Sequence, residues 1–339
     1  MDVCWPLNLS PEKIIKTIQN LTQSKRLWVA FSGGIDSHVL LDLMVLSFKN
    51  CPGYEVGALH IHHGISPKAD LWVEHCEQVC SELQVPLNVL WVDGNEIEGR
   101  SPEEVAREAR FSAFDSFLKE GECLVLAHHE ADQAETILLR LFRGSGPLGL
   151  GGMNEKTSFG KGELIRPLLN TPKEEIEDYA KQRKLVWIED ESNTNRRFDR
   201  NFLRHEIMPL VVARWPRVLR SVGRAAELCL ETATAVQVLA VNDLQTVQGK
   251  AAGNLSVSGL LALDPVRRKG VIRCWLQKLS YTLPSRDHME RIDREILKAS
   301  AGSRPKLKIS QYEIRRVKDE LSVRNYTKNT QDSPESEAS

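Results

Sequence analysis

The chain has 339 residues, of which 41% are hydrophobic and 27% charged, and a formal net charge of −1, which describes a globular protein long enough for two domains. No apolar run approaches the length of a membrane span and no basic, then apolar leader opens the chain, so we expect a cytoplasmic protein without a membrane partner. Seven scattered cysteines, an odd number, fit reduced thiols and argue against a disulfide framework.

Strands and helices alternate in the sequence as far as Arg204. Ser10 and Pro11 open a helix that we expect to reach about Thr22. The apolar run from Trp28 predicts a strand that stops at a glycine turn, and a helix then runs to near Phe48. Further strands are predicted at 55–62, 87–93, 123–127 and 185–188, and helices at 69–83, 101–119, 132–142 and after a capping box at 171–174. This alternation predicts an α/β fold with a Rossmann-like, doubly wound parallel sheet, whose ligands collect at the carboxyl ends of the strands.

The pattern changes beyond Arg204. Residues 218–241 predict a long helix, followed by a strand near 254–258, helices at 265–279 and 285–300, and strands within 307–323. The last dozen residues lack core-forming side chains. We therefore predict four parts: a first domain at 1–215, a connector helix at 216–245, a small α+β or mainly helical domain at 246–326, and a disordered tail at 327–339.

The glycine turn is the segment Ser32-Gly33-Gly34-Ile35-Asp36-Ser37, between a strand and a helix. Glycines let backbone amides approach an oxyanion, and the first turn of a helix leaves N–H groups pointing at it, so the segment predicts a phosphate cradle. A carboxylate beside phosphates needs a divalent cation between them, which makes Asp36 a magnesium-side residue. The alternative is a plain strand-to-helix turn with Asp36 and Ser37 as caps.

A second polar segment leaves the predicted strand at 123–127 and enters a helix. His128, Asp132 and Glu135 lie at positions i, i+4 and i+7, which would place them on one helical face, opposite an apolar stripe of Ala134, Ile137, Leu138 and Leu141. Such a face would open on the same crevice as the glycine turn. Carboxylates that merely favour the helix dipole are the alternative, and the spacing alone does not decide between the two.

Charge is unevenly distributed along the chain. Residues 265–325 hold 16 Lys or Arg against 7 Asp or Glu, and eight arginines lie between Arg196 and Arg224. Arginine binds phosphate with two parallel hydrogen bonds, so the two clusters together favour a nucleic acid as partner over solvated helix faces.

Six segments, in order, resemble the tRNA(Ile)-lysidine synthetase family of PP-loop ATP-pyrophosphatases. The resemblance is dense from Arg26 to Arg204 and thinner beyond. The segments are Ser-Gly-Gly-x-Asp-Ser at 32–37, Ala-His-His-x-x-Asp-Gln-Ala-Glu-Thr at 127–136, Leu-Phe-Arg-Gly-Ser at 141–145, Arg-Pro-Leu-Leu at 166–169, Asp-x-Ser-Asn at 190–193 and Arg-Asn-x-x-Arg at 200–204.

The resemblance implies a two-step ligation. ATP and Mg²⁺ would adenylate the C2 oxygen of the wobble cytidine in a tRNA(Ile) with a CAU anticodon, releasing pyrophosphate. The amino group of L-lysine would then displace AMP and leave lysidine. Residues 1–215 would be the adenylation domain and 246–326 the basic tRNA-binding domain, and a homodimer is left open.

The resemblance also implies roles for individual residues, all named here by their numbers in this chain. The implied catalytic residues are Asp36, Asp132, Glu135 and His129, with Asp36 on the magnesium through ATP. The implied ATP-binding residues are Ala30, Ser32, Gly33, Gly34, Ile35, Asp36, Ser37, His62 and Arg110, where His62 stands in place of the family's Asn. Asp132 and Glu135 would bind lysine, one holding its ammonium group and the other accepting its proton, in an order that the sequence does not give. The implied tRNA-binding residues are Arg197, Arg200, Arg204, Arg217, Arg267 and Arg268.

Two other functions fit parts of this pattern. A PP-loop tRNA cytidine thiolase would use paired cysteines, but Cys76 and Cys80 are not a Cys-x-x-Cys pair and no second pair exists, which also disfavours a zinc or iron–sulfur site. A non-catalytic ATP- and RNA-binding module would not need Asp36, Asp132 and Glu135 together. Many family members carry a further C-terminal domain, so we expect this chain to be a short or truncated form.

Overall fold

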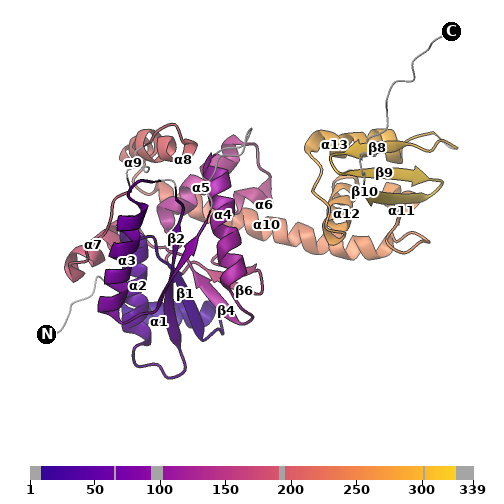
Figure 1. Cartoon of the computed structure of the whole chain (residues 1–339). Coiled ribbons are helices and arrows are strands. Elements are labelled where there is room, and N and C mark those ends of the chain that lie inside the picture. The colour runs from indigo at the N-terminus through magenta and orange to yellow at the C-terminus, as the bar shows by residue number, and fades with distance from the viewer. Residues whose placement is uncertain (1–8, 65, 93–101, 191–194, 301, 326–339) are drawn as a thin grey trace, which may run out of the picture. The chain divides into compact units, whose positions relative to one another are not determined.

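The computed structural model describes residues 9–64, 66–92, 102–190, 195–300 and 302–325. The chain forms two compact units, Met1–Leu230 and Glu231–Ser339, which divide within the long helix α10 (Val218–Thr246; Figure 1). The bounds 1–215, 216–245 and 246–326 remain predictions, and the predicted tail lies outside the described residues. No helix in the described ranges is both long enough and apolar enough to span a membrane.

The first unit is built on a six-stranded sheet in the order β3-β2-β1-β4-β6-β5. Its strands are β1 (Arg26–Ala30), β2 (Glu55–His62), β3 (Leu87–Trp91), β4 (Glu122–Val125), β5 (Lys156–Phe159) and β6 (Gly162–Ile165). All neighbours pair in parallel except β5, which runs antiparallel to β6. The chain passes from β1 to β2 on one side and later to β4 on the other, so a crevice opens at the carboxyl ends of β1 and β4. The predicted doubly wound α/β fold is confirmed.

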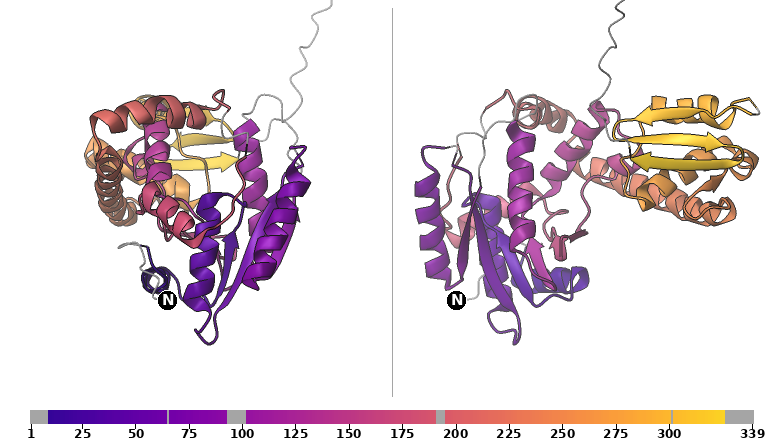
Figure 2. Two further views of the ribbon diagram at one scale, coloured as in Figure 1. Left: turned by 90° about the vertical axis from the view of Figure 1, so that its left-hand side faces the viewer. Right: turned by 45° about the vertical axis from the view of Figure 1, so that its right-hand side comes forward.

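Helices cover both faces of this sheet (Figure 2). The helices of the first unit are α1 (Pro11–Leu21), α2 (Ile35–Phe48), α3 (Ala69–Leu83), α4 (Pro102–Phe117), α5 (Glu130–Phe142), α6 (Pro147–Leu150), α7 (Lys173–Arg183), α8 (Asp199–Phe202), the π-helical turn η2 (Leu203–Ile207) and α9 (Met208–Arg214). Alternating side chains of β1 explain the two layers. Leu27 and Val29 pack in the core with α1, α2, α3 and α7, whereas Trp28 and Ala30 face the cluster that includes Phe114 of α4.

Helix α2 is the centre of the larger core, and its buried positions run around the whole helix rather than along one stripe. One of its buried polar residues is Asp42, whose side chain is 1% exposed. Asp42 Oδ2 accepts hydrogen bonds from Tyr179 Oη (2.7 Å) and Arg183 Nε (2.9 Å), both from α7. This polar cluster fixes α7 against α2, and the N-terminal turns of those two helices carry Lys173 and Asp36.

The second unit is α+β, one of the two predicted forms. Its antiparallel sheet has the order β7-β10-β9-β8, with strands β7 (Leu255–Ser256), β8 (Lys306–Ile309), β9 (Tyr312–Val317) and β10 (Glu320–Asn325). Its helices are α11 (Val257–Ala262), α12 (Pro265–Lys278), α13 (Arg286–Arg291) and the π-helical turn η3 (Ile292–Leu297). Trp275, Ile292 and Ile314 lie in its core with the end of α10.

Several local predictions were wrong. Residues 185–188, all described, form no strand, although Ile188 N donates to Gly33 O (2.9 Å). The β5–β6 hairpin and α11 were not predicted. No side chain caps α7, so the predicted capping box at 171–174 is absent there, and the box at 101–104 lies outside the described side chains. The predicted apolar stripe of α5 was wrong at Leu141, which is 50% exposed. The buried residues of this helix lie nearer its N-terminus and include Asp132, Gln133 and Glu135 as well as Ala134 and Ile137.

We expect Asp42→Ala to lower the free energy of unfolding by about 3–5 kcal/mol, because it leaves the Arg183 guanidinium and the Tyr179 hydroxyl without their acceptor. Tyr179→Phe removes one hydrogen bond and should cost about 1 kcal/mol. Chemical denaturation at neutral pH measures both. Lys181→Ala, which removes an exposed ion pair on the same helix, is the control and should change stability by less than about 0.5 kcal/mol. Equal losses for Asp42→Ala and the control would contradict this account.

Candidate active site

The glycine turn joins β1 to α2 and forms a compact, hydrogen-bonded loop. Gly33 has φ +84°, a left-handed conformation that favours glycine. Ser37 Oγ accepts from Ser32 N (3.2 Å) and donates to Gly34 O (3.0 Å), and Gly34 N donates to Ser32 Oγ (3.3 Å). These bonds hold the loop around the N-terminus of α2, where orphan amides and the helix dipole favour an anion.

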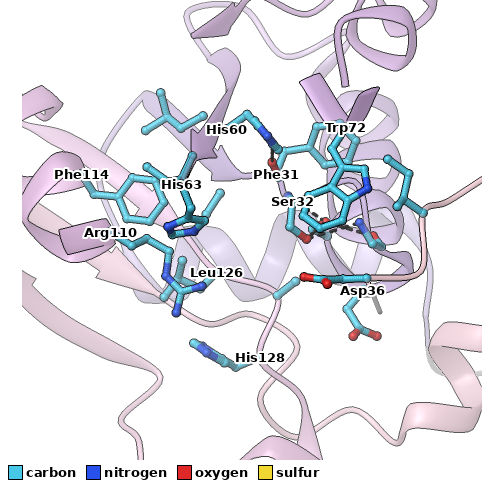
Figure 3. A pocket seen from close by; sticks show the side chains of 18 of the residues that line it. Phe31, Ser32, Asp36, His60, His63, Trp72, Arg110, Phe114, Leu126 and His128 are labelled. Carbon is cyan, nitrogen blue, oxygen red and sulfur yellow. Dashed lines mark hydrogen bonds between the residues drawn. The ribbon is translucent and has the colours of Figure 1, made fainter. Parts of the chain in front are cut away.

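A cavity of about 370 Å³ opens beside this loop, at the carboxyl ends of β1 and β4 (Figure 3). Its apolar wall includes Phe31, Leu59, Trp72, Phe111 and Phe114, which suits the flat surface of a nucleobase. Its polar lining consists of Ser32, Asp36, Ser37, His60, His63, Arg110, His128, Asp132 and Asp190. The cavity is thus lined by the phosphate cradle, by carboxylates and by an arginine.

Asp36 lies between two cationic or polar partners. Lys173 Nζ contacts Asp36 Oδ1 at 2.5 Å, and His129 Nε2 lies 3.7 Å from Asp36 Oδ2. Burial alone would raise the pKa of Asp36, but the hydrogen bond of His129, with the charge and hydrogen bond of Lys173, outweighs it and lowers that pKa. Asp36 is therefore ionised at neutral pH.

Asp132 and Glu135 are held by two arginines that lie one turn apart. Arg200 Nε donates to Glu135 Oε2 (2.8 Å) and Arg200 Nη2 to Asp132 Oδ1 (2.9 Å). Arg204 Nε donates to Glu135 Oε1 (2.7 Å) and Arg204 Nη2 to Asp132 Oδ1 (2.9 Å). Burial would raise the pKa of Asp132, but His129 and Arg200 outweigh it and lower that pKa to about 2. The arrangement is a closed cluster of two carboxylates and two guanidinium groups.

His129 connects this cluster to Asp36. His129 is the N-cap of α5. Its ring Nδ1 accepts a hydrogen bond from Ala131 N (3.2 Å), and its backbone N–H donates to Asp132 Oδ2 (3.1 Å). The other ring nitrogen, Nε2, then faces Asp132 Oδ2 (3.4 Å) and Asp36 Oδ2. His128 precedes the helix, so the predicted face shared by His128, Asp132 and Glu135 was wrong at its first position.

The structure brings some of the sequence-predicted ATP residues together and not others. Ala30, Ser32, Gly34, Asp36, Ser37 and Arg110 line the cavity, but Gly33, Ile35 and His62 do not. Ile35 packs against the large core instead. His62 Nε2 lies 3.1 Å from Asp70 Oδ1, and its ring lies 3.9 Å, between centroids, from the ring of Trp91. Of the predicted catalytic residues, Asp36 and Asp132 line the cavity, whereas His129 and Glu135 lie behind it.

The predicted tRNA-binding arginines also differ in their surroundings. Arg197 and Arg217 are exposed. Arg200 and Arg204 are engaged with Asp132 and Glu135, and Arg267 with Asp243. Arg268 is only 5% exposed, donates to the carbonyl groups of Leu260 and Leu263, and pairs with Asp293. Its guanidinium is thus used inside the second unit, and contact of Arg268 with tRNA stays a prediction.

Several cavity residues were not predicted. Lys173, which contacts Asp36 but does not line the cavity, was predicted only as part of a capping box, and Asp36 is 137 positions away from it. Trp72, Phe111 and Phe114 lie on helices whose apolar positions are typical of core. Asp190 was signalled only by its family motif, and His63 was not predicted. Side-chain pairings across such separations leave no periodic trace in a sequence.

The fold and the glycine cradle together define a PP-loop ATP-pyrophosphatase domain, and the family model for the PP-loop domain matches residues 8–211. A second family model, the TilS substrate binding domain, matches residues 255–322. A solved structure of the U34-tRNA thiolase NcsA from Methanococcus maripaludis is similar in fold, with a TM-score of 0.54 and 19% identity, covering 65% of this chain and 77% of that one.

Relatives extend the match to almost the whole chain. The tRNA(Ile)-lysidine synthase of Coxiella burnetii is 41% identical over 316 residues, covering 93% of this chain and 70% of that protein. The tRNA(Ile)-lysidine synthase of Shigella flexneri is 44% identical over 303 residues, covering 89% of this chain and 70% of that protein. The chain belongs to the tRNA(Ile)-lysidine synthase family, and its PP-loop domain uses ATP.

We expect the acid stability of the protein to depend on Asp132. The folded pKa of Asp132, about 2, lies below its unfolded value of about 3.9, so its pairing stabilises the folded state above about pH 4. That contribution is lost as the pH falls from about 4 toward 2, and it amounts to about 2 kcal/mol. Urea denaturation between pH 2 and 6 measures it.

Asp132→Asn is the matched variant for this experiment, because it removes the titration and keeps the side-chain shape. The difference in free energy of unfolding between wild type and Asp132→Asn should shrink as the pH falls through this window. A difference independent of pH between 2 and 6 would show that Asp132 has an ordinary pKa in the folded protein.

Proposed function

We propose that the chain is an ATP-dependent ligase that adenylates C2 of the wobble cytidine in a tRNA(Ile) with a CAU anticodon and then joins L-lysine to it, forming lysidine. The observation that carries this proposal is a single cavity that holds both the phosphate cradle at Ser32–Ser37 and the carboxylates Asp36 and Asp132. Phosphate and amine chemistry can therefore meet in one place. The names of the relatives support the same reaction.

In the first step, the cradle would bind the ATP phosphates while the apolar wall accepts the adenine ring. The carboxylate of Asp36 fits a magnesium ion shared with the nucleotide, because it lines the cavity beside the cradle and is ionised. The described residues include no group of three metal-ligating side chains, so phosphate oxygens would complete the coordination. Mg²⁺, when bound, offsets charge on the leaving pyrophosphate. Lys173 contacts Oδ1 of Asp36, whereas His129 faces Oδ2, and the contact of Lys173 holds the carboxylate in place.

In the second step, lysine needs a carboxylate for its ammonium group. Glu135 is 2% exposed and both of its oxygens accept hydrogen bonds from Arg200 or Arg204. Asp132 lines the cavity, and its low pKa makes it a weak base. We therefore infer that Asp132, with Asp36, holds an ammonium group, and that Glu135 positions the two arginines rather than contacting lysine.

The RNA contact would come from exposed arginines of the first unit, Arg197, Arg214, Arg217, Arg220 and Arg224, and from basic residues of the second unit. Arg214 also lies over the exposed ring of Trp215, with its guanidinium carbon 5.7 Å from the ring centroid, a pair on which an unpaired base can stack. A cytoplasmic location and a homodimer stay predictions.

Thiolation of a tRNA cytidine is the weaker alternative. Burial raises the pKa of the Cys76 thiol and raises that of Cys80 to about 12, and a thiol held in its protonated form is a poor sulfur carrier. The described cysteines form no pair beside the cradle.

We expect pyrophosphate release by the wild-type protein to require the cognate tRNA, and AMP release to require L-lysine in addition. Asp36→Ala should lower pyrophosphate release by at least about a hundredfold, because a carboxylate at the leaving group is lost, while tRNA affinity stays within about twofold. Radiolabelled ATP with transcribed tRNA measures both steps. Sulfur incorporation, or lysidine formation without ATP, would exclude the proposed reaction.

We expect tRNA binding to weaken steeply with salt. The double variant Arg197→Ala/Arg217→Ala should reduce the slope of log Kd against log salt concentration by about 2, since each phosphate contact contributes about 0.9. Filter binding between about 50 and 200 mM salt measures this slope. Lys16→Ala, an exposed charge on α1, is the control and should leave the slope unchanged. An unchanged slope in the double variant would remove these arginines from the RNA site.

A further inference from the structure

His128 and His129 are consecutive but have different surroundings. His129 is buried and both of its ring nitrogens lie against Ala131 N or the carboxylates of Asp36 and Asp132. His128 lines the cavity, and the one hydrogen bond of its ring to a described residue joins its Nδ1 to Arg166 Nε, at 3.3 Å. Its Nε2 has no partner among the described residues and is left to the cavity.

Arg166 follows β6, the strand that pairs in parallel with β4, and His128 follows β4. Register therefore places the two side chains at the same edge of the sheet. A guanidinium has only donors, so the Nδ1 of His128 must be the acceptor of this hydrogen bond. A neutral imidazole that accepts at Nδ1 carries its hydrogen on Nε2. The Arg166 contact thus selects one tautomer of His128.

The position of Arg166 is unusual for a charged side chain. It is 7% exposed, and its partners in the described part of the chain are neutral: the His128 ring and the carbonyl of Asn154 (2.7 Å). Burial, with the charges of Arg107 and Arg140, lowers the pKa of Arg166 to about 10. Burial, with the charge of Arg166 among others, lowers the pKa of His128 to about 3, so His128 is neutral at physiological pH.

We propose that Arg166 is a positioning residue that fixes His128 as the Nε2–H tautomer, and that this N–H donates to a phosphoryl oxygen of the bound nucleotide. The proposal rests on ATP occupying the cavity, as in the proposed function. It gives a role to the Arg-Pro-Leu-Leu segment, which the cradle and the carboxylate cluster leave without one. It also makes His128 a donor throughout the reaction, not a general base.

The charges around His128 favour a phosphoryl oxygen over a neutral one. One carboxylate, Asp132, and three guanidinium groups, Arg166, Arg200 and Arg107, act on the His128 ring, and Arg110 lines the same cavity. In Figure 3, His128 lies at the edge of the cavity, with Arg110 and Asp36 on either side of it in that view. An N–H donor whose charged neighbours include more cations than carboxylates is suited to an anionic oxygen. The carbonyl oxygen of the tRNA cytidine is the competing acceptor.

The test compares two amides at position 128. The amide nitrogen of Gln lies near the place of the histidine Nε2, whereas the shorter Asn side chain reaches only the place of Nδ1. His128→Gln should bind ATP within about threefold of wild type. His128→Asn should bind it about tenfold to a hundredfold more weakly, the loss typical of one hydrogen bond to a charged group.

Adenosine and tRNA identify the acceptor. Calorimetric titration with ATP and with adenosine, both without tRNA, should show a loss for ATP alone in His128→Asn. An equal loss for adenosine would place the contact on the base or ribose, and unchanged ATP affinity with lost adenylation of tRNA would place it on the cytidine oxygen. Either result, or equal behaviour of the Gln and Asn variants, overturns the proposal. An inactive wild-type protein would instead overturn the proposed function.

Arg166 needs a readout other than stability. With ¹⁵N-labelled histidine, NMR of the wild-type protein should show His128 protonated at Nε2 and unprotonated at Nδ1. Arg166→Met should mix or invert the tautomers and lower ATP affinity as His128→Asn does, and Arg166→Lys, which keeps a donor, should restore both. An Nε2–H tautomer that persists in a folded Arg166→Met protein would remove Arg166 from this role, and an Nδ1–H tautomer in the wild-type protein would refute it outright.

Discussion

Three carboxylates lie together at one edge of the sheet, and the candidate site depends on the ion pairs that stabilise them. Asp36, Asp132 and Glu135 would repel one another, and burying Glu135 unpaired would cost several kcal/mol. Lys173, Arg200 and Arg204 offset both effects, and they lie between 65 and 137 positions away in the chain. The segment that follows the last parallel strand therefore supplies all three of these cations. The charge balance of the site therefore depends on the packing of α7, α8 and η2, which carry these three cations.

The same pairing separates the carboxylates by what they can do. Glu135 is paired with its two arginines and does not line the cavity, whereas Asp132 and Asp36 both line it. Because its neighbours lower the pKa of Asp132 to about 2, and Asp36 is shifted in the same direction, both hold positive charge better than they accept a proton. The sequence could show that these residues lie near one another, but their difference arises from which arginine reaches which oxygen.

The fold was more predictable than the partners within it. The Ser-Gly-Gly turn, the apolar strands and the amphipathic helices are local signals, and they predicted the parallel sheet and most helix bounds. The short β5–β6 hairpin was missed because Lys156, Thr157 and Gly162 do not form an apolar run, and 185–188 was taken for a strand because it does. The exposure of a charged side chain is also hard to predict from sequence. Arg268 and Arg217 look alike in a basic sequence, yet one is bonded to carbonyls inside the second unit and the other is exposed.

Two buried or half-buried arginines near the ends of β4 and β6 differ in the charge of their partners. Arg204 has carboxylate partners, and although burial alone would lower its pKa, Glu135 and Asp132 raise it. Arg166 has only neutral partners among the described residues, and burial lowers its pKa. Between them, His129 bridges carboxylates and His128 accepts from a guanidinium. The two consecutive histidines thus lie against groups of opposite charge. Because both histidines follow β4, their order in the chain determines which one contacts the carboxylates and which one contacts Arg166.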